Sequence, residues 1–321
     1  MAVYTALDDQ DLHQLLARYR VGDLVEFTGI KAGVENSNWF VTTTGGEYVL
    51  TVFEKHPFAE VPYFLNLTAH LAEHDVPCAH PIADAAGDYL QSLRDKPAAL
   101  IERLPGRTLE HPDVDHCRQV GDALGRMHIA GFSFAEHHAN ERGPQWWFRT
   151  SHELEPLIDE DNRRVLAEER AYIRRYRDLD LPRGTIHADL FRDNILFDGD
   201  ELAGMIDFYY ACDDCLLYDV AVTVNDWCGN ADGRLDEARS RALLAAYHAR
   251  RPFTAAEGNA WNMMLRCGAL RFWLSRLLDL TFPRPAEIAH TKDPDEYRHI
   301  LLVRREEEAV LWPLADQTAT G

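Results

Sequence analysis

The sequence predicts an α+β protein of two lobes, and three observations indicate it. Short apolar strands separated by turn residues dominate the first hundred residues, and helical spacing of apolar residues dominates from residue 113 onward. The segment LPGRTLEHP lies between these parts and is typical of a linker, because it holds two prolines and a glycine. With 321 residues the chain also exceeds the usual size of one hydrophobic core. We therefore expect a strand-rich N-lobe over 1–104 and a helical C-lobe over 105–321.

The expected N-lobe begins with a helix over 8–20, because Leu12, Leu15, Leu16 and Tyr19 share one helical face. Strands follow around 24–27, over 39–44 and over 48–53, and Gly45-Gly46 joins the last two into a hairpin. Further along we expect a helix over 58–74, a second hairpin over 81–93 and a buried strand over 97–104.

The expected C-lobe is helical apart from one hairpin. Apolar spacing predicts helices over 113–129, 153–178, 214–228, 234–251, 256–280 and 295–313. The exception is 184–208, where short apolar runs flank an Asp-Gly-Asp turn and predict a β-hairpin.

Charge and cysteine content exclude several classes of protein. The chain carries 53 acidic against 33 basic residues, a net charge of −20, which argues against nucleic-acid or anionic-membrane partners. The first residues do not resemble a targeting peptide and no apolar run is long enough to cross a membrane, so we expect a cytoplasmic enzyme with reduced cysteines. Only Cys212 and Cys215, with Cys228 nearby, have metal-like spacing, and we do not expect a zinc site there.

The most informative stretch has the form H-x-D-x-x-x-x-N. It places His187, Asp189 and Asn194 in one loop, and Asp207 follows eighteen residues after Asp189 between apolar residues. Phosphoryl transfer from ATP needs a carboxylate that orients and deprotonates the attacking hydroxyl, and oxygen ligands that hold Mg²⁺. We therefore expect Asp189 to be the base and Asn194 and Asp207 to be the metal ligands.

Four segments resemble one family. They are GVENSNWFVTTTGGEYVLTVFE, HADLFRDNILF, GMIDFYYACDDCLLYDVAVTVNDWC and LRFWLSRLLDL. Together they resemble the aminoglycoside phosphotransferase-like kinases and, within them, the homoserine kinases. The resemblance implies a bilobal protein-kinase-like fold. It also implies ATP-dependent phosphorylation of the side-chain hydroxyl of L-homoserine to O-phospho-L-homoserine, a step of threonine biosynthesis.

The resemblance also assigns nucleotide-binding residues to the N-lobe. It implies that Gly33, Asn36, Ser37 and Asn38 belong to the loop over the phosphates, although glycine and asparagine also mark ordinary turns. It further implies an interlobe hinge at 100–104, where adenine meets backbone atoms of Glu102 and Leu104; a plain strand end is the alternative.

One part of the usual nucleotide site is missing from the sequence. Such kinases place a lysine on the third strand and pair it with a helix glutamate, but here the strand has Thr51 and the helix has Leu65 and Asn66. The chain holds only four lysines. We expect Lys31 to supply the substitute cation; Lys55 or an arginine is the alternative.

The acceptor should bind through its ammonium and carboxylate groups. We expect Asp226 to bind the ammonium and Arg271 the carboxylate, because a guanidinium forms directed bonds to carboxylates. The alternative is that both form structural ion pairs, with each other or with Asp213 or Asp219.

Three other functions are compatible with parts of the pattern. A kinase for choline, an aminoglycoside or another small alcohol would share the fold. A catalytically silent nucleotide-binding scaffold would explain Thr51. A metal hydrolase could use His128, His187 and Asp189.

Overall fold

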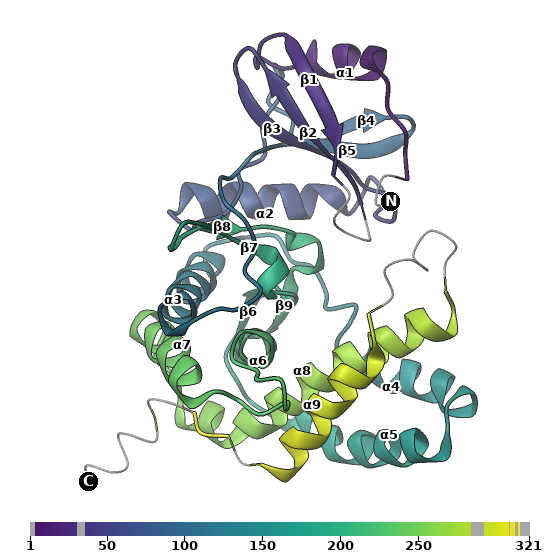
Figure 1. Ribbon diagram of the computed structural model, residues 1–321, viewed down its shortest axis with the longest axis vertical. Coiled ribbons are helices and arrows are strands. Elements are labelled where there is room, and N and C mark those ends of the chain that lie inside the picture. The colour runs from purple at the N-terminus through teal and green to yellow at the C-terminus, as the bar shows by residue number, and fades with distance from the viewer. Residues whose placement is uncertain (1–3, 31–35, 284–291, 308, 312–313, 315–321) are drawn as a thin grey trace. The chain divides into compact units, whose positions relative to one another are not determined.

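The chain folds into two compact units, which we describe separately. The computed structural model describes residues 4–30, 36–283, 292–307, 309–311 and 314. The first unit comprises Met1–Pro105, Ala203–Ile206 and Pro285–His290, and the second comprises Gly106–Leu202, Asp207–Arg284 and Thr291–Gly321. Strands dominate the first unit and helices the second, as expected for an α+β protein (Figure 1).

The first unit contains a five-stranded antiparallel sheet in the order β1-β2-β3-β5-β4. The strands are β1 Leu24–Gly29, β2 Ser37–Thr43, β3 Gly46–Val52, β4 Gln91–Leu93 and β5 Lys96–Glu102. The predicted hairpin over 81–93 is wrong. Only its last three residues form a strand, and they pair with β5 through a tight turn at Arg94 and Asp95, which both have positive φ.

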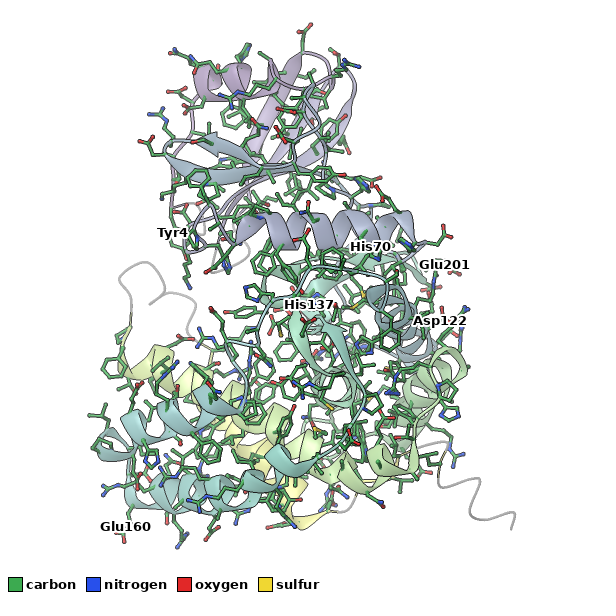
Figure 2. All side chains as sticks on the ribbon, turned by 180° about the vertical axis from the view of Figure 1, so that it is seen from behind. Tyr4, His70, Asp122, His137, Glu160 and Glu201 are labelled. Atoms are coloured by element: carbon green, nitrogen blue, oxygen red, sulfur yellow. The ribbon has the colours of Figure 1, made fainter. Side chains whose placement is uncertain are left out.

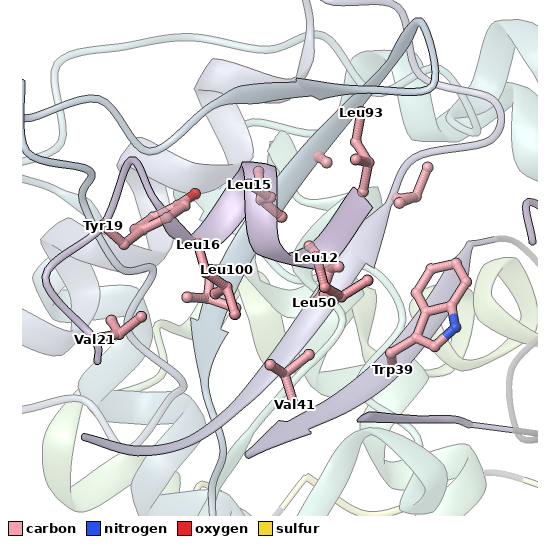
Figure 3. Close-up of a cluster of buried hydrophobic side chains, with 12 residues drawn as sticks. Leu12, Leu15, Leu16, Tyr19, Val21, Trp39, Val41, Leu50, Leu93 and Leu100 are labelled. Carbon is pink, nitrogen blue, oxygen red and sulfur yellow. The ribbon is translucent and has the colours of Figure 1, made fainter. Parts of the chain in front are cut away.

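One helix packs on this sheet to form the core of the first unit. Helix α1, Asp9–Leu16, buries three leucines against the sheet, and its N-terminus is closed by a capping box between Asp8 and Asp11. The cluster consists of Leu12, Leu15, Leu16, Tyr19, Val21, Trp39, Val41, Leu50, Val52, Leu93, Ala98 and Leu100 (Figure 3). Helix α2, Val61–Glu73, is the second helix of the unit.

The second unit is built around a buried helix. Its helices are α3 Val114–Gly131, α4 Pro144–Leu154, α5 Glu160–Ile173, α6 Leu216–Trp227, α7 Glu237–Arg250, α8 Ala255–Thr281 and α9 Pro294–Glu306. Helix α6 lies among α3, α7 and α8 and is buried at eleven of its twelve positions (Figure 1). The single helix predicted over 153–178 is wrong, because a 3-10 turn at Glu155–Leu157 ends α4 and Asp159 caps the new helix α5.

Two small two-stranded sheets position the loops. Strand β6, Arg183–Ile186, pairs with β9, Cys212–Cys215, so the helix predicted from 214 begins only at Leu216. Strands β7, Ile195–Asp198, and β8, Glu201–Met205, form the hairpin expected at the Asp-Gly-Asp turn, where Gly199 has a φ of 62°. Residues 187–194 therefore connect β6 to β7, and Asp207 follows β8 after one intervening residue.

The expectations about membrane segments and about cysteines can be compared with the described residues. Within the described residues no helix is long and apolar enough to span a membrane. All six cysteines are buried free thiols, and the part of the chain that the structure describes holds no cluster of three or more His, Cys, Asp or Glu side chains suited to a metal.

Helices α3 and α7 are in very close contact. Asp122 of α3 accepts a hydrogen bond from Nε of Arg250 at 2.6 Å (Asp122 is labelled in Figure 2). A Cβ on Gly121 would lie 2.1 Å from the carbonyl oxygen of Leu243, a distance that real side chains do not tolerate. The two backbones can approach this closely only because position 121 has no side chain.

We predict that Gly121→Ala lowers the free energy of unfolding by about 1–3 kcal/mol, because α7 must move away from α3. Gly258→Ala, also inside a helix, is the control. Its new Cβ meets only the tip of Leu314 at 3.0 Å, so the higher helix propensity of alanine should leave stability equal or up to about 1 kcal/mol higher. Urea unfolding of both variants tests this, and equal stability of the two would contradict it.

Candidate active site

The structure brings three of the predicted site residues together at the loop after β6. Nη1 of Arg271 donates to Oδ1 of Asp189 at 3.2 Å. Nδ2 of Asn194 donates to the backbone oxygen of Asp189 at 2.8 Å and to its Oδ2 at 3.2 Å. Each carboxylate oxygen of Asp189 therefore has a donor that fixes its direction and stabilises its ionised form.

Helix α8 and two aromatic rings hold Arg271 in place. Its side chain is buried, and the guanidinium carbon lies 3.8 Å from the ring centre of Phe272 and 5.0 Å from that of Tyr210. Structural ion pairs of Arg271 with Asp226, Asp213 or Asp219 are the alternative to a substrate contact. The ion pair in the structure joins Arg271 to Asp189, a partner that the sequence does not suggest.

Asp219 of α6 fixes the backbone at the start of the loop. Its carboxylate accepts hydrogen bonds from the backbone N–H of His187 at 2.7 Å and of Ala188 at 2.8 Å. Ala188 has a φ of 64°, a left-handed conformation that costs an alanine about 1–3 kcal/mol and persists only where neighbours impose it. Burial raises the pKa of Asp219, but the hydrogen bonds from His128 and from the backbone of His187, with the electrostatic effect of both histidines, together outweigh this and hold the pKa below its usual value.

Sequence reasoning considered Asp219 only as an ion-pair partner and missed this role. The available signal was an acid in the first turn of a mostly apolar helix, since a buried carboxylate must find donors. His187 is fully buried, with its ring 4.6 Å from that of Phe208. His128 is hydrogen-bonded to Asp219 and Tyr247, so the geometry does not support a metal hydrolase that uses this histidine.

Asp226 holds the other end of the loop. Its Oδ2 accepts from the backbone N–H of Arg192 at 2.8 Å and from the Nε of the same residue at 3.1 Å. Burial raises the pKa of Asp226 above its usual value. Asp226, which the sequence suggests for the ammonium group of the acceptor, thus already pairs with the guanidinium of Arg192. Asp213 pairs instead with His137 at 2.8 Å (His137 is labelled in Figure 2).

Asn194 and Asp207 offer oxygen atoms of the kind that Mg²⁺ prefers. Asn194 uses its amide nitrogen for Asp189, which leaves its amide oxygen as the atom suited to a cation. Asp207 has a φ of 63°, a left-handed conformation that aspartate tolerates better than most residues. The donor set of one carboxylate and one amide oxygen fits Mg²⁺.

In the first unit, two of the predicted nucleotide residues, Lys31 and Gly33, lie outside the described residues. Oγ of Ser37 donates to Glu54 at 2.6 Å and accepts the backbone N–H of Tyr4 at 2.7 Å. Oδ1 of Asn36 accepts the backbone N–H of Glu54 at 3.4 Å. Ser37 therefore ties the N-terminal segment to the start of β2.

Thr51, at the place expected for the lysine, donates to Oδ1 of Asn38 at 2.7 Å. The two residues are cross-strand partners, so both lie on the sheet face opposite to Ser37 and Val52. Lys96 forms an ion pair with Glu54, on the face of Ser37. Lys96 therefore does not replace the missing lysine on the face of Thr51.

The predicted adenine contacts lie at the end of β5. The backbone N–H of Glu102 donates to the carbonyl oxygen of His80 at 2.9 Å, and Leu104 is half-buried. The side chain of Glu102 is exposed, whereas its backbone N–H is held by the hydrogen bond to His80.

Comparison with known proteins identifies relatives over nearly the whole chain. The model of the phosphotransferase enzyme family matches residues 26–253. A homoserine kinase from Methylobacillus flagellatus is 50% identical over 315 residues, which cover 97% of this chain and 99% of the relative. A homoserine kinase from Janthinobacterium is 46% identical over 312 residues, covering 96% and 97%.

Solved structures support the same fold. An amicoumacin kinase in complex with AMP-PNP and Ca²⁺ matches with a TM-score of 0.70 and 17% identity over 94% of this chain and 93% of that one. A spectinomycin phosphotransferase in complex with ADP matches with a TM-score of 0.63 and 11% identity over 92% and 94%. Similarity at this level shows a shared fold, the protein-kinase-like fold that the motifs implied.

We predict that Glu54→Gln destabilises the protein by about 1–2 kcal/mol at pH 7, because its charge-assisted bond to Lys96 is lost. Burial raises the pKa of Glu54, but hydrogen bonds from Lys96, Ser37 and Thr5 outweigh it and lower the pKa. A carboxyl group whose pKa is lower in the folded than in the unfolded protein stabilises the fold at pH values above its unfolded-state pKa. This stabilisation is lost as the pH falls through its folded-state pKa.

The stability difference between wild type and Glu54→Gln should therefore shrink as the pH falls from 7 to about 3. Urea unfolding at a series of pH values measures it. Glu47→Gln is the matched control, because its pair with Arg103 is mostly exposed and should contribute less than about 0.5 kcal/mol. A difference independent of pH would contradict the prediction.

Proposed function

Because this chain belongs to the phosphotransferase enzyme family and, within it, to the homoserine kinases, we propose which of its residues carry out phosphate transfer from ATP to homoserine. Relatives with this activity are 45–50% identical over more than nine-tenths of the chain. This similarity favours homoserine over choline or an aminoglycoside as acceptor, and activity over a silent scaffold. The product is O-phospho-L-homoserine, an intermediate of threonine biosynthesis.

Asp189 is the proposed base. Its carboxylate accepts the proton of the homoserine hydroxyl as the hydroxyl oxygen attacks the γ-phosphorus, and ADP leaves with the electrons of the broken bond. The observation that carries this assignment is the orientation of the carboxylate by Arg271 and Asn194, on a loop anchored by Asp219. A carboxylate that is already oriented lowers the activation barrier more, because no entropy is lost in orienting it during the reaction.

Asn194 and Asp207 are the proposed ligands of Mg²⁺, through the amide oxygen of the first and the carboxylate of the second. When bound, the ion neutralises charge on the phosphate oxygens of ATP. The support is the chemistry of the donors, together with the use of the Asn194 nitrogen to orient the base.

The nucleotide contacts in the first unit remain those that the sequence suggests: Lys31, Gly33, Asn36, Ser37, Asn38, Glu102 and Leu104. Within this set the structure favours different roles. The Ser37 hydroxyl is engaged by Glu54 and by the N-terminal segment, so we assign it to anchoring the loop rather than to the phosphates. The amide oxygen of Asn38 accepts a hydrogen bond from Thr51, so we assign its amide nitrogen to the nucleotide contact.

Arg271 is the proposed carboxylate site of the acceptor. A guanidinium carries five donors in a planar fork, so one side chain can bind two carboxylates. Binding substrate and base with one guanidinium would place the homoserine hydroxyl beside Asp189. Asp226 was the expected ammonium site, but its contacts with Arg192 favour a role in holding the loop.

We predict that Asp189→Asn lowers kcat by about 10²–10⁴-fold, because the amide cannot accept the proton, while the KM for ATP changes little. ADP release in the presence of homoserine measures this. Asp193→Asn on the same loop is the matched control. That carboxylate is exposed and pairs with Lys292 at 3.0 Å, so kcat should stay within about twofold. Full activity of Asp189→Asn would refute the assignment of the base.

We predict that Arg271→Gln raises the KM for homoserine at least tenfold, since a charge-assisted bond is worth about 1.5–3 kcal/mol, and leaves the KM for ATP unchanged. Arg276→Gln on the same helix is the control, because Arg276 pairs with Glu296 and should not affect either KM. Asp226→Asn tests the remaining expectation. A rise in its KM for homoserine alone would restore Asp226 as the ammonium site, and an unchanged KM for Arg271→Gln would remove Arg271 from the acceptor site.

A further inference from the structure

A buried chain of three side chains leads from helix α7 to the catalytic loop. Nδ1 of His128 on α3 lies 2.7 Å from the hydroxyl of Tyr247 on α7, and Nε2 of His128 lies 3.1 Å from Oδ2 of Asp219. All three residues are essentially inaccessible to solvent. The proposed catalytic chemistry does not use Tyr247 or His128 directly.

The hydrogen bonds define one tautomer of His128. Asp219 is an acceptor when ionised, so Nε2 of His128 must carry the hydrogen that it donates. Burial raises the pKa of the Tyr247 hydroxyl well above its usual value, so the hydroxyl keeps its proton. Among the described residues the hydroxyl has no other hydrogen-bond partner, so it donates to an unprotonated Nδ1. A proton on Nδ1 would leave the buried O–H of Tyr247 without an acceptor, which is costly.

The carboxylate of Asp219 links the tautomer of His128 to the backbone of the loop over residues 187–194. Oδ2 of Asp219 accepts both from His128 and from the backbone N–H of His187, and Oδ1 accepts from Ala188. These contacts impose the left-handed conformation of Ala188, the residue before the proposed base. A tilt of the Asp219 carboxylate would therefore change the direction of the Asp189 side chain.

We propose that Tyr247 and His128 are positioning residues for phosphate transfer: the Tyr247 hydroxyl fixes the His128 tautomer that holds Asp219, and through Asp219 it fixes the backbone that aims Asp189. This inference rests on the proposed role of Asp189 as base. Without the hydroxyl, the ring of His128 can place its hydrogen on Nδ1, and the lone pair on Nε2 then faces the carboxylate of Asp219. Asp219 then loses one of its fixed donors, although no group near the substrate has changed.

The first measurement is the turnover of Tyr247→Phe. We expect kcat to fall about five- to tenfold, the effect of one hydrogen bond, with both KM values within about twofold of wild type. Tyr176→Phe is the matched control, because it also removes a buried tyrosine hydroxyl bonded to an aspartate, at 3.0 Å from Oδ1 of Asp214. It should lower the melting temperature similarly and leave kcat within about twofold. All assays are run well below the melting temperature of each variant.

The second measurement replaces His128 by glutamine, a side chain that has no alternative tautomers. Glutamine at position 128 can donate its amide hydrogen to Asp219 and has only one arrangement of hydrogens. If Tyr247 acts through the tautomer, Tyr247→Phe should lower kcat less than twofold in a His128→Gln background, against five- to tenfold in wild type. This difference between backgrounds is not expected of a residue that only stabilises the fold.

Each outcome has a definite meaning. Equal losses of kcat for Tyr247→Phe in both backgrounds, or a loss no larger than that of Tyr176→Phe, would overturn the proposal. A failure of Asp189→Asn to lower kcat would instead refute the proposed base, independently of the Tyr247 result. If His128→Gln does not fold, the comparison of Tyr247→Phe with Tyr176→Phe still decides.

Discussion

The hydrogen bonds from the backbone of His187 and Ala188 to Asp219 are the interaction on which the active site depends. They impose a conformation on Ala188 that it would not adopt by itself. Asp226 holds the far end of the same loop and lies seven residues after Asp219 on α6, so both carboxylates are on one stripe of the helix. A single helix in the core of the second unit thus fixes both ends of the loop that carries the proposed base.

The fold class and the family were predictable from the sequence, and parts of the site were not. Asp189 and Asn194 lie in one short loop, so their spacing along the chain indicates their proximity. The pair of Arg271 with Asp189 spans 82 residues and depends on how α8 packs, which no local pattern records. The break at Glu155–Leu157 was missed because apolar spacing continues through it while Pro156 ends the helix.

The distribution of charge in the first unit shows how few cations are available for a nucleotide. The chain has a net charge of −20 and four lysines. Lys96 is bound by Glu54 on the face of the sheet where Ser37 holds the N-terminal segment. On the opposite face a neutral pair, Thr51 and Asn38, stands at the place of the usual lysine. The sequence alone could show that the lysine was missing, but not that Lys96 was already engaged elsewhere.

The close contact of α3 with α7 restricts how this protein can change over evolution. Gly121 lies seven residues before His128, and Leu243 lies four before Tyr247, so the glycine contact and the histidine–tyrosine bond share one helix interface. Any lineage that enlarges residue 121 must also move the hydroxyl of residue 247 relative to the ring of residue 128. We therefore expect substitutions at positions 121, 128, 243 and 247 to arise together among divergent descendants.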